Sequence, residues 1–468
     1  MAERNRWFLA LVMLCACMHA RAADDLLAIY RDAMLNNADY QAARLGVEAD
    51  RQDVDIAKAQ LLPALALSGN SNQSKTDRTA PNVLGTPKSD SFTYNNYSYS
   101  LNLRQPLYRP ALSARLRQSH AVLLSSEANL DKTAQDLAVK VVAAYCDALF
   151  AIDQHRLVLA QREALTAQLN AAQRSFQVGS GTLTDIDEAQ SKLDIVNVQE
   201  IEAANRIEDT KRSIGALIGR DVTMLLPLNP AKIEQGMLEL HSLNDWIADV
   251  EKHNPELESL RNQVAASEEE VSKTREGHFP TLDFVASRTD SANDSTTTLS
   301  KSGDTKYQTT SIGVQLNLPL FNGGAVNASV RQARAKLEQA RYKYEEVRRN
   351  LGVEVRKQYN ATMQGLARSR ALQQAQESSI RLVYSEGKGI QAGTRTSIDL
   401  LLAEQQLNAA RKDLAESRYS YLVSRIRLMS LAGAISEQEI VRMNSWFGNP
   451  ASHVDETAVT GDKPANVE

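Results

Sequence analysis

One nine-residue stretch occurs twice in this sequence and constrains the fold more than any other feature. Residues 177–185 are Gln-Val-Gly-Ser-Gly-Thr-Leu-Thr-Asp, and residues 391–399 are Gln-Ala-Gly-Thr-Arg-Thr-Ser-Ile-Asp. The copies are offset by 214 residues, and each lies between two long runs of helical pattern. Gly commonly ends a helix with a positive φ, and a following Thr or Ser caps the next one. The sequence therefore predicts two helical hairpins, each with one copy as its turn.

The flanking helical runs carry apolar residues at heptad spacing in both halves of the chain. Such repeats predict helices that pack as coiled coils. A plain dimeric coiled coil is one alternative, but each half interrupts its helices with a segment of strand pattern. Glu200 breaks one register. The heptad positions are Leu116, Leu123, Leu130, Leu137, Ile186, Leu193, Ile207 and Ile214 in the first half, and Val330, Leu337, Tyr344, Leu351, Leu400, Leu407, Leu414, Tyr421 and Leu428 in the second.

The interrupting segments, residues 64–105 and 281–318, are rich in Ser, Thr, Asn and Gly and contain alternating apolar residues. Alternation with period 2 predicts strands with one apolar and one polar face. Each half should therefore contribute one β-hairpin, with polar loops at about 72–90 and 290–305. A soluble hairpin packed on a core is the simpler alternative. Apolar-out, polar-in strands in an exported chain favour an outer-membrane barrel instead.

The N-terminus has the pattern of a secretory signal peptide, with Arg4 and Arg6 before an apolar run and a small-residue cleavage site at Ala20-Arg-Ala22. A lipoprotein signal with Cys17 as the attachment site is the competing interpretation. Cleavage after residue 23 would leave Cys146 as the single cysteine, which excludes an intrachain disulfide.

These observations predict a mixed α+β membrane protein built by duplication. Residues 1–23 form the signal peptide, and the first repeat, 24–219, runs helix (24 to about 60), β-hairpin, long helix, turn and helix. Residues 220–242 are a linker, 243–433 the second repeat and 434–468 a largely disordered tail. Four strands cannot close a barrel, and lipid tolerates no open sheet edge. The chain should therefore oligomerise.

Several function classes find no support in the sequence. The net charge is −4 without a basic block, which argues against nucleic-acid binding. No phosphate-binding loop, metal-ligand spacing or nucleophile motif is recognisable. We therefore expect no enzymatic activity, no catalytic residues, no cofactor and no metal. A periplasmic coiled-coil adaptor or structural protein is the alternative to a channel.

The duplicated order of helices, strands, prolines and turns resembles the TolC family of outer-membrane export channels over nearly all of residues 24–433. The resemblance implies a homotrimer in the outer membrane of a Gram-negative bacterium. Its twelve-stranded β-barrel would continue into a periplasmic α-barrel of coiled-coil helices. It also implies a periplasmic adaptor, an inner-membrane ABC or proton-driven transporter, and export of proteins or small toxic compounds.

The resemblance also implies a gate at the helical turns, where Arg395 would bind Thr184 and Asp185. Asp399 matches an aspartate of the family's constriction, and three copies would form an anionic ring that favours cations and raises the pKa of each carboxylate. Leu402 replaces a second constriction aspartate, and Ile390 replaces a tyrosine of the gate network. The glycines near the turns are candidate adaptor contacts, namely Gly179, Gly181, Gly387, Gly389 and Gly393.

Overall fold

The computed structural model describes residues 24–81, 85–230, 232, 242–297, 300–301 and 305–448. The predicted signal peptide, most of the second half of the predicted linker and residues 449–468 of the predicted tail lie outside this part. Internal packing divides the chain into two units. One comprises Met1–Arg44, Leu130–Pro255 and Arg348–Glu468, and the other comprises Leu45–Asn129 and Glu256–Val347. No helix in the described part is long and apolar enough to cross a membrane.

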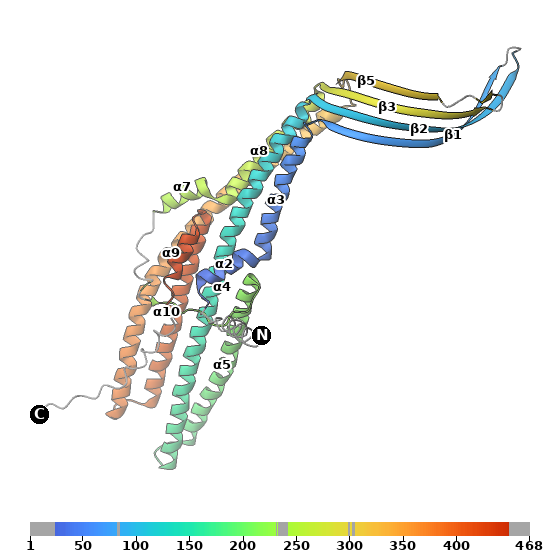
Figure 1. The fold of residues 1–468 in the computed structure, drawn as a ribbon. Coiled ribbons are helices and arrows are strands. Elements are labelled where there is room, and N and C mark those ends of the chain that lie inside the picture. Colours follow the sequence, from blue (N-terminus) through green and yellow to red (C-terminus); the bar gives the residue numbers. More distant parts are fainter. Residues whose placement is uncertain are drawn as a thin grey trace, which may run out of the picture. The chain divides into compact units, whose positions relative to one another are not determined.

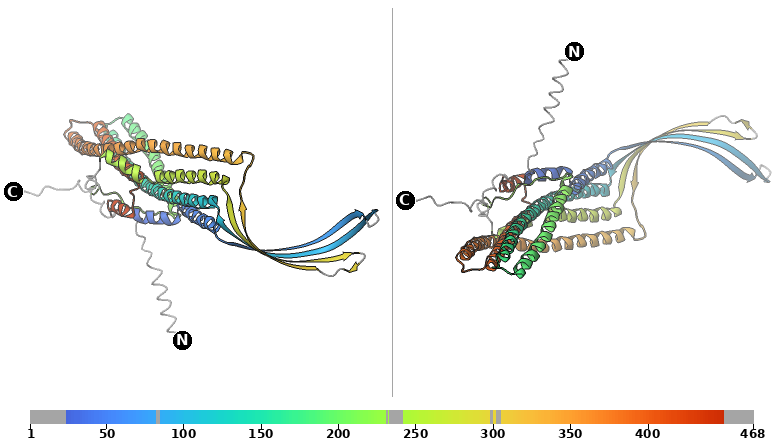
Figure 2. Two further views of the ribbon diagram at one scale, coloured as in Figure 1. Left: turned by 90° about the horizontal axis from the view of Figure 1, so that it is seen from above. Right: turned by 90° about the horizontal axis from the view of Figure 1, so that it is seen from below.

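The strands form one antiparallel sheet in the second unit, and the long ones run side by side with a common curvature (Figure 2). Strand β2 pairs with β1 and β3, and β3 also pairs with β5 and the short β4. The predicted pair of hairpins is thus confirmed, and they join into one sheet through β2 and β3. The strands are β1 (Ala64–Pro81), β2 (Pro87–Tyr108), β3 (Thr281–Thr297), β4 (Ser300–Lys301) and β5 (Thr305–Asn317).

The strands extend much further than the sequence predicts, so the predicted polar loops at 72–90 and 290–305 are wrong. The β1–β2 ladder continues from Ala64–Arg104 to Pro81–Pro87. Ladder hydrogen bonds come from the backbone, so polar residues can extend a strand without an apolar pattern. Polar cross-strand contacts also occur, as between the Thr79 and Ser89 hydroxyls at 2.8 Å.

One face of the sheet is apolar near its junction with the helices, as the alternation predicts. Leu65 pairs with Leu103 across β1 and β2, and Phe284 pairs with Val314 across β3 and β5. Large apolar side chains on this face are exposed, and Leu67 keeps 75% of its surface accessible. Such a face fits strands whose outer side contacts lipid.

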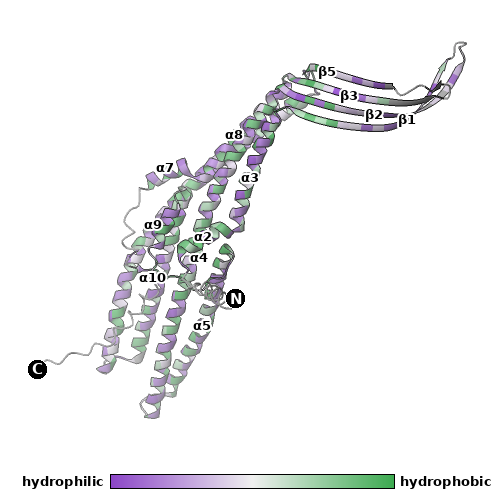
Figure 3. Cartoon of the chain, viewed as in Figure 1, coloured by the Kyte–Doolittle hydropathy of each residue, from purple (hydrophilic) through white to green (hydrophobic). Residues whose placement is uncertain are grey.

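The two predicted helical hairpins are confirmed, and each joins a very long helix to one about half its length (Figure 1). In Figure 3 apolar and polar residues alternate around these helices. All the predicted heptad residues are buried or half-buried. The register break at Glu200 has a local cause, because its carboxylate pairs with Arg162 at 2.5 Å. The helices are α4 (Pro110–Gln177), α5 (Leu183–Ile218), α9 (Ala325–Gln391) and α10 (Ser397–Leu431).

The first predicted helix, residues 24 to 60, is interrupted at Asn37 and forms α2 (Leu26–Asn36) and α3 (Ala38–Ala59). Asn37 has extended backbone angles, and its side-chain oxygen accepts a hydrogen bond from the Tyr40 backbone N–H at 3.1 Å. Asn side chains compete with helical backbone bonds in this way. The second repeat breaks at Asn254, whose backbone is also extended, as expected before Pro255. The break separates α7 (Leu243–His253) from α8 (Pro255–Arg275), which a 3-10 turn follows (Glu276–His278).

A compact core in the first unit holds the segment after α5 against the long helices. Tyr145 is fully buried, and its hydroxyl donates to the Leu226 carbonyl and accepts from the Leu226 N–H, both at 3.0 Å. The Phe447 ring lies edge-on to Tyr145 with centroids 5.0 Å apart. Phe447 follows α11 (Glu437–Asn444), a helix that the sequence analysis does not predict and whose Ile440 is fully buried.

A buried ion cluster ties β2 and β3 together where the sheet meets α4. Asp283 is 2% exposed and accepts hydrogen bonds from two arginines. Arg104 Nη2 and Arg109 Nη2 lie 2.7 and 2.6 Å from Asp283 Oδ2, and Arg109 Nε lies 2.7 Å from Oδ1. The cluster spans the irregularity in the β2–β3 register at Pro106 and Tyr108. It therefore fixes the register at the point where the regular ladder is disturbed.

We expect Asp283→Ala to lower the free energy of unfolding by about 2 kcal/mol, because it removes the charge-assisted hydrogen bonds that join two partly exposed arginines to one carboxylate. The measurement is denaturation of the detergent-solubilised protein followed by circular dichroism. Glu346→Ala is the control, since it removes only the exposed Lys343–Glu346 pair, and such pairs contribute little. Equal effects of the two substitutions would contradict a stabilising role for the cluster.

Candidate functional site

The two repeated turns share three backbone hydrogen bonds, and the first turn adds a bond from the Gly181 N–H to the Ser175 carbonyl at 3.1 Å. Gly179 and Gly393 adopt φ of 76° and 72°, which confirms the prediction that glycine ends each long helix. The Ser180 N–H donates to the Ser175 carbonyl at 2.9 Å, and the Thr394 N–H donates to the Gly389 carbonyl at 2.9 Å. The two turns therefore have closely similar backbones and differ mainly in their side chains.

A capping box begins the helix after each turn. Thr182 accepts a hydrogen bond from the Asp185 N–H at 3.2 Å, and Asp185 Oδ2 accepts from the Thr182 N–H at 2.9 Å. Thr396 and Asp399 repeat both bonds, at 3.3 and 2.9 Å. Reciprocal bonds of this kind satisfy the first free N–H groups of a helix. Both aspartates thus have a local structural role, whatever else they do.

These hydrogen bonds also set the charge state of the two carboxylates. Bonds from the Thr182 backbone and hydroxyl hold the pKa of Asp185 below its usual range. The pKa of Asp399 is lowered by the same bonds from Thr396 and, less strongly, by the charge of Arg395. The expectation that neighbouring copies raise the pKa of Asp399 concerns three chains and stays a prediction.

Arg395 follows Gly393 in the second turn, and its side chain is 55% exposed. Its Nε lies 3.3 Å from Oε2 of Glu386 in α9, a residue that the sequence analysis missed. Thr184 and Asp185 lie in the first turn of α5 and are exposed. Among the described residues of this single chain, no hydrogen bond or ion pair joins Arg395 to either of them. Glu386 carried one usable signal, because an acid near a helix C-terminus is unfavourable without a cation nearby.

The remaining predicted site residues fall into two groups. Gly179, Gly181 and Gly393 lie in the turns, whereas Gly387 and Gly389 lie inside the last turns of α9. Leu402, at the position of the family's second constriction aspartate, is 58% exposed on α10. Ile390, at the position of the family's tyrosine, is half-buried.

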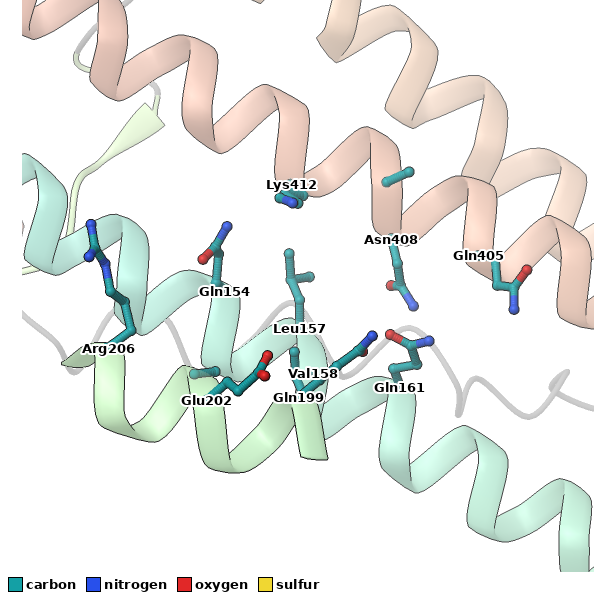
Figure 4. Close-up of a pocket in the computed structure, with 12 residues that line it drawn as sticks. Gln154, Leu157, Val158, Gln161, Gln199, Glu202, Arg206, Gln405, Asn408 and Lys412 are labelled. Carbon is teal, nitrogen blue, oxygen red and sulfur yellow. The ribbon is translucent and has the colours of Figure 1, made fainter. Parts of the chain in front are cut away.

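A polar groove of about 530 Å³ lies between the α4–α5 hairpin and α10 (Figure 4). Its walls are held by Leu165, Val196 and Leu401, which bury one another at a contact of the three helices. Neither His, Cys, Ser nor Tyr lines it, so its lining offers no hydroxyl, thiol or imidazole group. Across the described part of the chain, no group of three or more His, Cys, Asp or Glu could hold a metal ion. The lining residues are Gln154, Leu157, Val158, Gln161, Gln199, Glu202, Ala203, Arg206, Gln405, Asn408, Ala409 and Lys412.

The lowered pKa values make the stability of the helix starts depend on pH. A carboxylate with a depressed pKa stabilises the fold above its unfolded pKa, and this contribution is lost as pH falls through the folded value. Hydrogen–deuterium exchange, corrected for intrinsic rates, should therefore show protected amides at 182–187 and 396–401 near neutral pH and weaker protection well below about pH 4.

The matched control is Thr396→Ala, which removes the capping hydroxyl from α10 and leaves α5 intact. It should weaken protection at 396–401 even at neutral pH, with residues 182–187 unchanged. Protection that is independent of both pH and Thr396 would exclude a stabilising role for these capping boxes.

The model of the outer membrane efflux protein family matches residues 29–220 and 246–434. The proteases secretion protein PrtF of Dickeya chrysanthemi is 32% identical over 470 residues, covering 98% of this chain and 99% of PrtF. The alkaline protease secretion protein AprF of Pseudomonas aeruginosa is 35% identical over 444 residues, covering 94% of this chain and 91% of AprF. TolC of Escherichia coli is 26% identical over 436 residues, covering 92% of this chain and 86% of TolC.

Solved structures agree with this fold. The CusC channel has a TM-score of 0.72 at 16% identity, covering 88% of this chain and 93% of CusC. The CmeC outer membrane channel of Campylobacter jejuni has a TM-score of 0.72 at 18% identity, covering 90% of this chain and 89% of CmeC. Together with the duplicated hairpins and the curved sheet, these matches show that the chain belongs to the outer membrane efflux protein family, the family of the TolC export channels.

Proposed function

We propose that this chain is the outer-membrane channel of a type I secretion system and that its cargo is a secreted protein. Sequence identity to relatives of different cargo supports the proposal. PrtF and AprF, both named as protease secretion proteins, are 32% and 35% identical over at least 94% of the chain. The efflux proteins BepC of Brucella suis and TtgC of Pseudomonas putida are 24% and 22% identical over at most 87% of it.

Efflux of small toxic compounds is the second candidate function, because the family model itself describes efflux proteins. The alternative of a periplasmic adaptor or structural coiled coil is abandoned. The family match covers both hairpins and both strand segments, whereas an adaptor normally has one hairpin. The channel itself performs no chemistry in this proposal.

The proposed assembly is a homotrimer that docks onto a periplasmic adaptor and an inner-membrane transporter, ABC or proton-driven. The four long strands in the described part of the chain leave two sheet edges, and lipid offers these edges no hydrogen-bonding partners. A trimer would close twelve long strands, as the TolC resemblance implies. The adaptor would contact the turns near Gly179, Gly181, Gly387, Gly389 and Gly393.

The proposed gate is the ring of helical turns. Arg395 would bind Thr184 and Asp185 across neighbouring hairpins and hold the closed state. Its half-exposed guanidinium and the exposed Asp185 carboxylate are both accessible for such a link. Three copies of Asp399 would form the anionic constriction, with its Oδ1 free of the capping bonds made by Oδ2.

Deletion of the gene, followed by complementation, tests the cargo. The culture supernatant should lose a secreted protein and regain it with the wild-type gene, while susceptibility to detergents and antibiotics changes little. An unchanged set of secreted proteins together with a severalfold loss of drug resistance would instead establish efflux. A soluble periplasmic monomer on fractionation would exclude a channel.

Arg395→Ser should raise the single-channel conductance of the purified protein in planar bilayers severalfold. The substitution removes the cation of each gate link, and three symmetric losses add in favour of the open state. Arg370→Ser, in the body of α9, is a control for loss of one surface arginine. Equal conductance of Arg395→Ser and wild type at matched salt would refute the gate assignment.

Divalent or trivalent cations added on the periplasmic side should block the pore through the Asp399 ring. Asp399→Asn should weaken this block severalfold, and Leu402→Asp, which adds a second ring one helical turn away, should strengthen it. Bilayer titration with hexamminecobalt(III) measures both effects. Block that is the same in Asp399→Asn as in wild type would place the cation site elsewhere.

A further inference from the structure

Glu386 is a buried carboxylate in the last turns of α9, only 9% exposed. Within the described residues, the one cation paired with it is Arg395, whose Nε lies 3.3 Å from Oε2. An acid near a helix C-terminus meets the negative end of the helix dipole. Desolvation adds to this cost. The Arg395 charge is what compensates for both.

The aliphatic part of the Arg395 side chain lies against Gly389, which belongs to the same helix as Glu386. A Cβ at 389 would overlap Arg395 Cγ and would lie 3.0 Å from Arg395 Cβ. These are the atoms nearest the backbone, so a short rotation of the side-chain tip would not relieve the clash. Gly389 therefore leaves the space through which the arginine reaches Glu386. Gly352, in the body of the same helix, faces open space, with nothing beyond its own helix backbone within 4 Å of an added Cβ.

The first turn has the same backbone but none of these three features. The positions that match Glu386, Gly389 and Arg395 at the offset of 214 are Ala172, Ser175 and Gly181. There the arrangement is inverted, because a Cβ at Gly181 would lie 3.0 Å from Ser175 Cβ. Hairpin folding therefore does not require Glu386, the space left by Gly389, or Arg395. Glu386 and the space left by Gly389 occur only in the turn that carries Arg395, which indicates that their role is to hold that side chain.

We propose that Glu386 and Gly389 form a seat that positions Arg395 for its gate link. This inference rests on the proposed gating role of Arg395. The seat holds the guanidinium by charge, with Nε nearest to Oε2 of Glu386, which accepts no hydrogen bond among the described residues. Nη1 and Nη2 carry four of the five guanidinium N–H donors. These donors stay available to Thr184 and Asp185, and the seat has already restricted the rotamers of the arginine. Glu386 is thus a positioning residue that acts through Arg395.

Planar-bilayer conductance of the purified full-length protein tests the seat. Glu386→Gln keeps the side-chain shape and removes the charge. Gly389→Ala keeps every charge and fills the space that the Arg395 side chain occupies. Both should raise conductance severalfold, up to the level of Arg395→Ser. Gly352→Ala is the matched control, since it makes the same change in the same helix far from Arg395, and it should conduct as wild type. Circular dichroism and oligomer stability in detergent verify folding of each variant.

The same two substitutions made in the Arg395→Ser background should add nothing, because the seat acts only through that arginine. A further rise of equal size in this background would reduce Glu386 and Gly389 to structural residues and overturn the proposal. Wild-type conductance of both single variants would also overturn it, as would a fall in conductance of Glu386→Gln, which would mean that Glu386 competes for the arginine. If Gly389→Ala does not assemble, the conductance of Glu386→Gln alone tests the proposal.

These outcomes separate the seat from the gate itself. If Arg395→Ser raises conductance and the seat variants do not, the gate stands and the seat is refuted. If Arg395→Ser conducts as wild type in a working channel, both are refuted. A protein that forms no channel in any variant would refute the proposed function as a whole.

Discussion

A helix of 68 residues is stable in water only if the apolar residues along its length are covered by other elements. The chain meets this constraint by folding each long helix back through a tight turn onto a shorter one. Apolar side chains are then buried where the helices pack together, as at Leu165, Val196 and Leu401. Apolar side chains such as Ile195, Val198 and Ile201 stay exposed on α5 in the single chain, whereas the groove between the helices is lined mainly by amides and charges. Such walls suit a water-filled conduit better than a site for an apolar ligand.

The turns and the helix seams are the parts of this fold that sequence predicts best, and the reason is that their determinants are local. The positive φ of Gly179 and Gly393 and the capping by Thr182 and Thr396 depend on residues within one or two helical turns. Heptad spacing likewise reports burial directly, even where Glu200 interrupts it. Duplication then gives each pattern a second, independent occurrence.

Prediction fails where stability comes from the backbone or from distant contacts. The polar ends of β1 and β2 are held by ladder hydrogen bonds that leave no apolar pattern. The break at Asn37 depends on one competing side chain. Helix α11 is short and is secured by a core that includes Tyr145, about 300 positions away. In the candidate site, Arg395 and Asp399 were found through a family motif, whereas Glu386 lies outside that motif and becomes visible only once the turn is built.

The two turns show how a duplicated element can specialise without a change of backbone. At the first turn, Gly181 accommodates Ser175, and at the second, Gly389 accommodates Arg395. In both turns one of the two facing positions is glycine, because two side chains would overlap there. Which position is glycine decides whether the turn carries a large cation. Gly179 and Gly393 supply a similar φ and both capping boxes are intact, so this choice leaves the helix ends on both sides of the turn alike. Two structurally equal hairpins can therefore divide the roles of donor and acceptor in a gate.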